Sequence, residues 1–412
     1  MENLKFWSGR AHFGKVRMMS LTNHWVSLIF SGTAALFLAL TLAALWHLRW
    51  VRRLPALETL TAPAGSAPAP PAEPVRVSVV VAARNEEARI EGTVRRLMAQ
   101  RGAEAEFLIV DDRSTDRTGE ILRQLAKEDA RVKVKRVDVL PDGWLGKCHA
   151  CHVGASAATG DWILFTDADC WSKPDVIARA VRLAEREGAD HVAISPRMDL
   201  KSTASRAWYL LFLTSISHWF SGVNRDRPKS YIGIGAFNLV RSSAYRQCGG
   251  YEALRLTVLD DLKLGLLLRR AGKRTRAFLG AEDVECHWGT TVWSMVKLLE
   301  KNYFASLDFN LGLALGGSVA AILIFSIVGL GLMSGTAAGL AAALSPLTLI
   351  LPATIMARQV GWPWPCALGV PFMEPVFLYA LLNSTWVTMR QGGVRWRDTF
   401  YSLETLRART VR

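Results

Sequence analysis

Two aspartates stand two residues apart near the middle of the chain, in the segment ILFTDADC. Asp167 and Asp169 follow an apolar run of the kind that forms a buried strand, and a strand directs alternate side chains to one face. Two carboxylates that project together can hold a hard divalent cation, which in turn can bind a diphosphate. A solvated strand end with ordinary acidic turn residues would have the same sequence, so the pair alone leaves both interpretations open.

A second group of polar residues follows two other apolar runs. Asn85 and Glu86 come after VSVVVAAR, and Asp111 and Asp112 end FLIVDD. Because ligands in open α/β sheets sit at the carboxyl ends of the strands, these four side chains are candidates to bind a base and a ribose. Capping of the two following helices by Asn85 and by Ser114 or Thr115 is the simpler explanation for part of the pattern. It does not account for two successive acidic residues at the end of a strand.

A third acidic pair, Asp260 and Asp261, opens the amphipathic segment VLDDLKLGLLLRRAGKR. Carboxylates favour helix N-termini, so a dipole effect is the simplest explanation. A carboxylate in a cleft can instead act as general base on an acceptor hydroxyl. Gly233 and Gly235 precede the pair in YIGIGAF, and glycine lets the backbone approach a ligand closely. We therefore expect the acceptor near these glycines.

The stretch LGKCHACHVG contains C-x-x-C-H, the spacing of a c-type haem attachment and of half a zinc site. A membrane-bound electron-transfer protein with haem c is the alternative function from another class. The six cysteines of the chain form no second C-x-x-C pair, so the zinc site would be incomplete. We expect both cysteines and both histidines to be ordinary helix residues.

The elements that would position these groups alternate between strand and helix. This alternation predicts a mostly parallel sheet covered by helices. The predicted strands cover 75–84, 105–112, 131–137, 161–169 and 190–196, and the predicted helices cover 86–100, 118–129 and 174–188.

The rest of the 412-residue chain has the composition of membrane segments. Residues 25–46 are 22 uncharged residues with Trp at both ends, which predicts a retained anchor over about 25–47 rather than a cleaved signal peptide. Residues 309–357 carry no charge for 49 positions, long enough for two spans. The segment 360–389 is broken by four prolines. It could be a third span, a re-entrant segment or an interfacial one, and three full spans would place the basic tail opposite the soluble domain.

The predicted organisation has six parts. They are an N-terminal region with the anchor (1–53), a Pro/Ala-rich linker (54–74), the α/β domain (75–290), an interfacial helix (291–308), two or three membrane segments (309–390) and a basic tail (391–412).

In order along the chain, the motifs are strand-Asn-Glu, VDD-x-S-x-D, D-x-D and DD. This order resembles that of the family 2 glycosyltransferases with the GT-A fold, over about 75–287. Within the family the chain looks most like membrane-anchored bacterial enzymes that glycosylate lipids. These include carotenoid-ester and hopanoid-associated glycosyltransferases, with ceramide glucosyltransferases more distant. The segments LPDGWLGKCHAC and GGVRWRDTFYSLETLR carry the narrower similarity.

The resemblance implies a GT-A-type α/β fold, with a mostly parallel sheet, helices on both faces, and transmembrane helices at both ends. It also implies that Asp261 is the base that deprotonates the acceptor, with Asp260 beside it. The donor would be a UDP-type nucleotide sugar. Asn85, Glu86, Asp111 and Asp112 would bind its nucleoside, Lys147 would face the nucleotide or diphosphate, and Asp167 and Asp169 would hold Mg²⁺ or Mn²⁺, with Asp169 the direct ligand.

The chain departs from processive members of the family, which carry Q-x-x-R-W after the base. The corresponding region, 292–309, has no Arg-Trp pair, and Lys297 or Lys301 would take the phosphate-facing role. The absence of the Q-x-x-R-W motif argues against a polysaccharide synthase and favours an enzyme that transfers a single sugar. The segment 205–222 is apolar enough to dip into the bilayer surface or to form a buried core helix.

We therefore expect an inverting, metal-dependent transfer of one sugar to a membrane lipid at the cytoplasmic face. A transferase that loads a polyprenyl phosphate is the enzymatic alternative. The net charge of +14 favours an anionic membrane surface as a partner, and we expect no nucleic acid partner. The expected location is the bacterial inner membrane, with the catalytic domain in the cytoplasm. The sequence does not indicate an oligomeric state.

Overall fold

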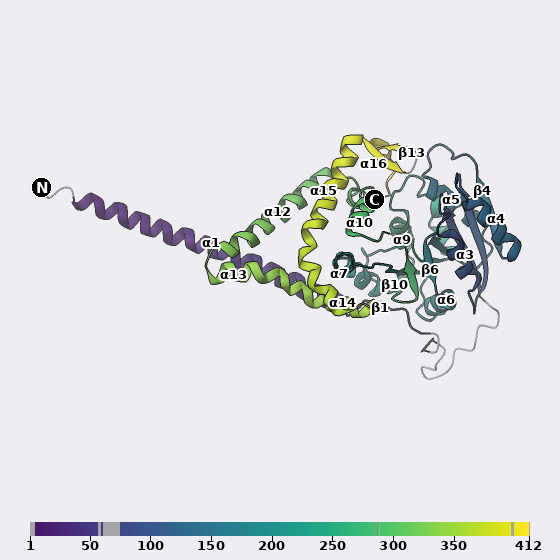
Figure 1. The fold of residues 1–412 in the computed structure, drawn as a ribbon, viewed down its shortest axis with the longest axis horizontal. Coiled ribbons are helices and arrows are strands. Elements are labelled where there is room, and N and C mark those ends of the chain that lie inside the picture. The colour runs from purple at the N-terminus through teal and green to yellow at the C-terminus, as the bar shows by residue number, and fades with distance from the viewer. Residues whose placement is uncertain (1–4, 57–58, 61–74, 288, 397–398, 412) are drawn as a thin grey trace.

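The computed structural model describes residues 5–56, 59–60, 75–287, 289–396 and 399–411, with side chains from residue 24 onward. Its centre is an eight-stranded sheet (Figure 1) in which β9 runs antiparallel to both neighbours and the other described pairs are parallel. The strands in spatial order are β1 (Arg52–Arg53), β10 (Thr275–Leu279), β7 (His191–Ser195), β9 (Asn238–Arg241), β5 (Trp162–Asp167), β2 (Arg76–Ala83), β3 (Glu104–Asp112) and β4 (Val132–Val137).

Alternating apolar side chains give the sheet two buried faces. Val79 and Val81 of β2 pack into one core, whereas Val80 packs into another on the opposite face, as the period of a strand requires. The mostly parallel sheet with helices on both faces is confirmed. One face is covered by α3 (Ile90–Met98), α4 (Thr118–Glu128) and α6 (Val176–Arg186), and the other by α5 (Gly146–Ser156), α8 (Ser242–Gln247), the 3-10 turn η1 (Gly250–Glu252) and α9 (Asp260–Arg270).

A second, three-stranded sheet follows the end of β5. Its strands are β6 (Cys170–Ser172), β11 (Val284–Cys286) and β8 (Arg197–Met198), with β11 in the middle. The register places Cys286 directly opposite Cys170. The long helix α7 (Thr203–Asn224) lies between this region and the apolar helices, because its side chains share a core with residues of α14 and η3, described next.

Within the described part of the chain, three apolar helical segments are long enough to cross a membrane: His24–Leu48, Leu311–Met333 and Ala337–Gln359. The anchor expected over about 25–47 lies in the first of them. In Figure 1 these helices project away from the sheet on one side. They belong to α1 (Lys5–Leu48), to α12 (Leu311–Met333), and to the run α13 (Ala337–Leu344), η2 (Ser345–Leu349) and α14 (Ile350–Gln359).

The proline-rich segment after α14 forms η3 (Trp364–Phe372) and α15 (Glu374–Gln391), which meet at an angle of 57°. Pro371 lies inside η3 and Pro375 at the start of α15, and proline breaks a helix because it removes a backbone donor. In Figure 1, α15 runs between the ends of α12 and α14 that lie nearest the sheet.

The segment 291–308, expected to form one interfacial helix, instead contains two short helices, α10 (Val292–Leu299) and α11 (Tyr303–Ser306). A side chain from α15 holds the break. The hydroxyl of Ser384 accepts a hydrogen bond from the Phe304 backbone N–H and donates one to the Glu300 carbonyl. It thereby satisfies backbone groups that a continuous helix would have paired internally.

The basic tail is folded against the α/β domain. It forms a hairpin of β12 (Gly393–Trp396) and β13 (Thr399–Ser402), followed by α16 (Leu403–Arg409). The Tyr401 hydroxyl donates to the Trp144 carbonyl over 3.2 Å, and Arg407 donates to the Phe309 carbonyl over 2.8 Å. The tail therefore lies on the same side of the apolar helices as the domain.

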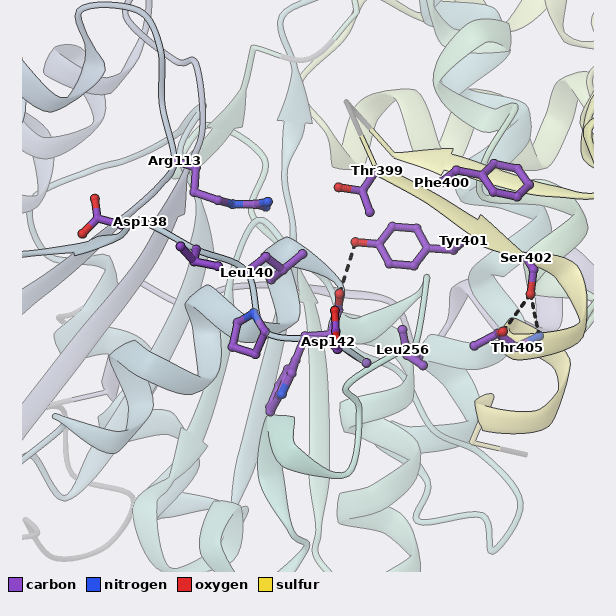
Figure 2. Close-up of a pocket in the computed structure, with 14 residues that line it drawn as sticks. Arg113, Asp138, Leu140, Asp142, Leu256, Thr399, Phe400, Tyr401, Ser402 and Thr405 are labelled. Carbon is purple, nitrogen blue, oxygen red and sulfur yellow. Dashed lines mark hydrogen bonds between the residues drawn. The ribbon is translucent and has the colours of Figure 1, made fainter.

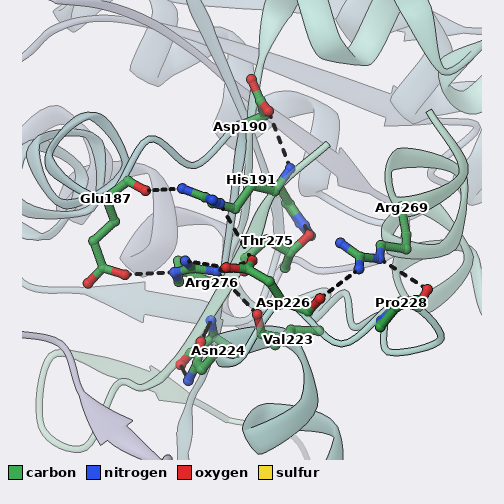
Figure 3. A network of polar contacts seen from close by, with 12 residues as sticks. Glu187, Asp190, His191, Val223, Asn224, Asp226, Pro228, Arg269, Thr275 and Arg276 are labelled. Atoms are coloured by element: carbon green, nitrogen blue, oxygen red, sulfur yellow. Dashed lines mark hydrogen bonds and ion pairs between the residues drawn. The ribbon is translucent and has the colours of Figure 1, made fainter. Parts of the chain in front are cut away.

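An ion-pair network joins the segment that follows α1 to the domain. Arg276 lies 2.7 Å from Glu187 and 2.8 Å from Asp226 (Figure 3). Glu187 also pairs with Arg52 of β1 at 2.9 Å. Arg276 is buried, and losing one partner of a buried pair is costly. These contacts dock the short strand β1, and hence the anchor that precedes it, on the sheet edge.

The buried His191 makes stability depend on pH. Its ring nitrogens lie 2.5 Å from Asn238 Oδ1 and 3.1 Å from Thr275 Oγ1. Burial lowers the pKa of His191 to about 4, against the opposing effect of Asn238 and then of Asp190. Between the ordinary value near 6.5 and about 4, the unfolded chain binds more protons than the folded one, so stability falls as pH falls through this range. The loss approaches about 3 kcal/mol at pH 4.

We expect the thermal unfolding midpoint of the detergent-solubilised protein to decrease when the pH is lowered from 7.5 to 5. His191→Gln should flatten that dependence relative to the parent, since glutamine does not titrate. The matched control is His218→Gln, because His218 is exposed. An unchanged slope in His191→Gln would show that other groups cause the acid sensitivity.

Candidate active site

The D-x-D and DD motifs meet across a glycine. Asp167 ends β5 and Asp261 lies in the first turn of α9. The Gly235 backbone N–H donates to Asp261 Oδ2 over 2.7 Å. A Cβ placed on Gly235 would lie 2.6 Å from Asp167 Oδ2 and 3.3 Å from Asp261 Oδ2. Both carboxylates therefore face the same space at the carboxyl edge of the sheet.

Lys147 supplies the positive charge of this space. It stands in the first turn of α5, with its Nζ 2.7 Å from Asp167 Oδ1 and 3.7 Å from Asp260 Oδ2. Burial lowers the pKa of Lys147, but Asp167, Asp260 and Asp261 outweigh it and hold the pKa well above its ordinary value. The lysine expected to face the nucleotide thus lies between the two acidic motifs.

The two adjacent aspartates of α9 have different surroundings. Asp260 is buried and accepts a hydrogen bond from the Tyr251 hydroxyl at 3.0 Å. Asp261 accepts backbone hydrogen bonds from Gly235 and from Leu262. Burial, followed by the charge of Asp260, raises the pKa of Asp261 to about 6, against the opposing effect of Lys147. Asp260 is therefore held by the Tyr251 hydroxyl, whereas Asp261 lies with Asp167 beside Gly235.

Asp169 lies in the turn between β5 and β6. Its Oδ1 is 3.6 Å from Cys170 Sγ and 3.8 Å from Cys286 Sγ. Burial, followed by the negative charges of Asp167 and Glu86, raises the pKa of Asp169 to about 6, against the opposing effect of Arg89. Such a concentration of negative charge favours a bound cation.

Two of the residues expected at the nucleoside connect loops. Asn85 Oδ1 accepts from the Thr115 backbone N–H at 2.8 Å, which ties the β2–α3 loop to the β3–α4 loop. Asp111 is buried and pairs with Arg136 at 2.7 Å. These contacts position the loops, and the capping explanation considered for Asn85 is replaced by a link between neighbouring strand ends.

The other two residues of that group, Glu86 and Asp112, have different surroundings. The negative charge of Glu86 is one of the causes, after burial and Asp167, that raise the pKa of Asp169. The Glu86 backbone N–H donates a hydrogen bond to the Thr118 hydroxyl. Asp112 accepts two hydrogen bonds from its neighbour Arg113, at 2.7 and 3.1 Å. Arg113 has a φ of +57°, a left-handed conformation that is uncommon outside glycine. The structure brings Glu86 toward the D-x-D motif and turns Asp112 toward Arg113.

A cavity of about 570 Å³ lies beside Arg113. Figure 2 shows Arg113 and the 138–144 loop on one wall and the tail residues Phe400 and Tyr401 on the other. The sequence predicted only a basic tail over 391–412, and this wall was not expected. Its signal was Gly392, which ends the preceding helix, followed by the alternation of Val394 and Trp396 with arginines, which is typical of a strand.

Gly233 and Gly235, expected near the acceptor, contact the start of α9. A Cβ on Gly233 would lie 1.8 Å from the Asp261 carbonyl oxygen. Lys301, expected to face a phosphate, lies 3.7 Å over the ring of Trp396 in the tail. The glycines therefore set the position of Asp261, and Lys301 contacts the hairpin.

Replacing Gly235 by alanine should slow catalysis without preventing folding. The added methyl group would meet the far end of the Asp167 side chain, so the carboxylate moves and the backbone does not have to. A displacement of about 1 Å in a reacting group costs roughly a hundredfold in rate. The measurement is the transfer rate together with the unfolding midpoint. The control is Gly317→Ala in α12, whose Cβ would have no neighbour within 4 Å, and equal rates in the two variants would contradict this role for Gly235.

The C-x-x-C-H stretch lies in α5. Cys148 and Cys151 are buried against the core, and His149 and His152 pack on Trp144 with ring centroids 5.3 and 5.0 Å away. Among the described residues, two groups of three or more ligating side chains could hold a metal, and neither includes these four residues. They are Asp169 with Cys170 and Cys286, and Asp199 with Glu285 and His287.

Several known proteins are similar to this chain over about half of its length. Residues 78–249 match the model of glycosyl transferase family 2. A 4,4'-diaponeurosporenoate glycosyltransferase of Staphylococcus haemolyticus is 26% identical over 208 residues, which cover 50% of this chain and 54% of that protein. A beta-monoglucosyldiacylglycerol synthase of Nostoc sp. is 31% identical over 218 residues, which cover 51% of this chain and 42% of that protein. The chain thus spans about half the length of the curated relatives it matches.

A solved structure shares the fold. It is a mannosyltransferase from Pyrobaculum calidifontis in complex with GDP-Man and Mn2+, with a TM-score of 0.50 and 17% identity over 87% of this chain and 98% of that chain. At this identity the likeness concerns the fold alone, and it agrees with the GT-A arrangement expected from the motifs. The matched segment and the relatives together support a family 2 glycosyltransferase domain over residues 78–249.

Proposed function

We propose that this protein transfers a single sugar from a nucleotide-diphosphate sugar, a UDP-sugar, to a membrane lipid, with inversion at the anomeric carbon. The observation that carries the proposal is the convergence of Asp167, Asp261 and Lys147 at the carboxyl edge of the sheet. A lipid acceptor is supported by the apolar helices joined to the domain. It is also supported by the relatives named as a 4,4'-diaponeurosporenoate glycosyltransferase and a beta-monoglucosyldiacylglycerol synthase.

The acidic groups present fit a divalent cation. Asp167 and Asp169 offer carboxylate oxygens, the donors that Mg²⁺ and Mn²⁺ prefer. The pKa of Asp169 is raised by burial and then by the negative charges of Asp167 and Glu86, and a cation would offset that negative charge. Asp167 and Asp169 would hold the ion. When bound, it would stabilise the negative charge of the departing nucleoside diphosphate.

Asp261 would act as the general base. As the acceptor oxygen forms its bond to the anomeric carbon, its proton passes to a carboxylate oxygen of Asp261. The bond from the anomeric carbon to the diphosphate breaks on the opposite face, and its electron pair leaves with the diphosphate oxygen. The Gly235 and Leu262 N–H groups hold Asp261 in place throughout. Lys147, beside Asp167, would face the negative charge that develops on the leaving group.

We propose three spans, α1, α12 and α13–α14, with α15 lying at the membrane surface. A fourth span would place the tail on the side opposite the domain, whereas Tyr401 contacts Trp144 of the domain. Basic residues at the ends of α1 and α14 and the uncharged turn at 333–337 favour a cytoplasmic domain. A single cysteine added after residue 412, in a variant with the native cysteines changed to serine, should be protected from membrane-impermeant maleimides in intact cells. Labelling before permeabilisation would place the tail outside.

The proposed function is tested by the lipids of a bacterial host. Membranes with the protein, supplied with labelled nucleotide sugars, should contain a lipid with one added labelled sugar, found by mass spectrometry. Membranes with the Asp261→Asn variant, expressed at an equal level, are the control. Label on a polyprenyl phosphate would support the alternative acceptor, and absence of any lipid-linked label across a panel of nucleotide sugars would contradict the proposal.

A further inference from the structure

Two cysteines face the carboxylate of Asp169. Cys170 of β6 and Cys286 of β11 are free thiols, 2% and 6% exposed, at directly opposed positions of the small sheet. The two sulfur atoms lie 3.6 and 3.8 Å from Asp169 Oδ1, and all three atoms are within 4.8 Å of one another. The three groups therefore converge on one point.

The backbone pairing explains this convergence. The His287 N–H donates to the Asp169 carbonyl, and the Lys173 N–H donates to the Asp283 carbonyl. In this antiparallel register, Cys170 and Cys286 occupy a position between hydrogen-bonded pairs, where opposed side chains approach most closely. The strands themselves hold the two thiols together, and Asp169 lies one residue before Cys170 at the same strand end.

The distances match the ligand shell of a tetrahedral zinc ion. Zinc binds sulfur at about 2.3 Å and carboxylate oxygen at about 2.0–2.2 Å, so two such ligands of one tetrahedron stand about 3.5 Å apart. The observed oxygen–sulfur separations of 3.6 and 3.8 Å are close to that value. Thiolates select zinc and softer ions, whereas Mg²⁺ takes oxygen ligands.

We propose that Asp169, Cys170 and Cys286 form a binding site for a soft divalent cation, zinc, which shares Asp169 with the hard-metal site of the transferase. Three protein ligands leave the fourth position of the tetrahedron to water. Each thiol releases one proton to solvent as its sulfur binds the ion. Because Asp169 serves both ions, zinc excludes Mn²⁺ from the D-x-D motif and inhibits transfer. That last consequence rests on the proposed function, whereas zinc binding does not.

The other ligating group near β11 is already neutralised by cations. Glu285 pairs with Arg197 at 2.8 Å, and Asp199 pairs with Lys201. His287 lies 3.5 Å from Asp199 and 3.4 Å from Glu285. A zinc ion there would have to displace two ion pairs, so this group serves as the competing location in the test.

The test uses the full chain, purified in detergent, reduced and stripped of metal. Cadmium reports thiolate ligands through its sulfur-to-metal absorption, and zinc affinity is measured by competition with a chromophoric chelator. We expect one zinc per chain and a thiolate–cadmium band. In the Cys170→Ser/Cys286→Ser variant the thiolate–cadmium band should be lost. Its zinc affinity should be lower by roughly a hundredfold or more, since even loss of an outer-shell partner costs 10–100-fold.

Two controls locate the ion. Cys148→Ser/Cys151→Ser and His287→Asn should each retain the zinc affinity and the cadmium band. Absence of the band in the reduced parent, its persistence in Cys170→Ser/Cys286→Ser, or loss of zinc binding in either control would overturn the proposal. A size-exclusion profile shows that each variant is folded.

The shared ligand is tested without measuring activity. The electron paramagnetic resonance signal of free Mn²⁺ reports how much Mn²⁺ is bound, and stoichiometric zinc should release it. Zinc binding without Mn²⁺ release would leave the thiol site in place and refute the sharing of Asp169. Failure of the proposed transfer reaction would leave both binding results unaffected, so the two proposals fail separately.

Discussion

Asp261→Asn is expected to reduce the rate of sugar transfer by about 10²–10⁴-fold, the usual contribution of a general base. Asparagine has the shape of aspartate, and its one oxygen can still accept one of the two hydrogen bonds that Gly235 donates to Oδ2 and Leu262 donates to Oδ1. It cannot take up the acceptor proton at neutral pH. The measurement is the steady-state rate of the purified variant in lipid vesicles, and the KM for the donor should change little because Asp261 acts on the acceptor.

The matched variant is Asp260→Asn. Asp260 lies one residue away, but it is buried and bonded to Tyr251. Its replacement should alter positioning and cost less in rate than the change at Asp261. A larger loss from Asp260→Asn than from Asp261→Asn would assign the base to the other aspartate, and near-normal transfer in both variants would refute the mechanism.

Asp169→Ala is the second change with a large expected effect. Removing this carboxylate should abolish tight Mn²⁺ binding and reduce transfer by about 10²–10³-fold, the cost of losing a group that stabilises charge in the transition state. Mn²⁺ binding is measured by electron paramagnetic resonance and transfer by product formation. Each value is compared at increasing Mn²⁺, because a weakened site should recover part of its activity at high metal.

Asp161→Ala is the control for that change. Asp161 stands just before β5, at the opposite end of the strand from Asp169, and forms an exposed pair with Arg76. Exposed pairs contribute about 0–1 kcal/mol, so the variant should fold and bind Mn²⁺ like the parent. Equal Mn²⁺ affinity in Asp169→Ala and Asp161→Ala would remove Asp169 from the metal site.

The meeting of the acidic motifs was predictable from the sequence because one rule governs it. Parallel strands place their carboxyl ends at one edge. Asp167 lies at the carboxyl end of a strand in both the expected fold, where the strand covers 161–169, and the observed fold, where β5 ends at Asp167. The prediction of Asp261 needed the family resemblance as well, because a helix N-terminus alone is explained by its dipole. The sequence showed that Gly233 and Gly235 permit a close approach. It could not show that the partner is α9 rather than a ligand, since that depends on how a loop folds onto a distant helix.

The position of the tail against the domain could not be predicted from local sequence patterns. Tyr401 and Trp144 are 257 positions apart, and their contact depends on the spans turning back toward the domain. No local propensity encodes that return, and the basic residues of the tail conceal the alternation of its hairpin. The thiol cluster was missed for a related reason: Cys170 and Cys286 are neighbours only through the pairing of β6 with β11.

The stereochemistry of the product tests the central claim most directly. The purified full-length protein, reconstituted with its acceptor lipid and supplied with Mn²⁺, should convert an α-linked UDP-sugar into a glycolipid that carries one β-linked sugar, assigned by nuclear magnetic resonance of the anomeric proton. A single displacement by an acceptor that Asp261 deprotonates requires this inversion. An α-linked product, or transfer that continues undiminished in Asp261→Asn, would contradict it.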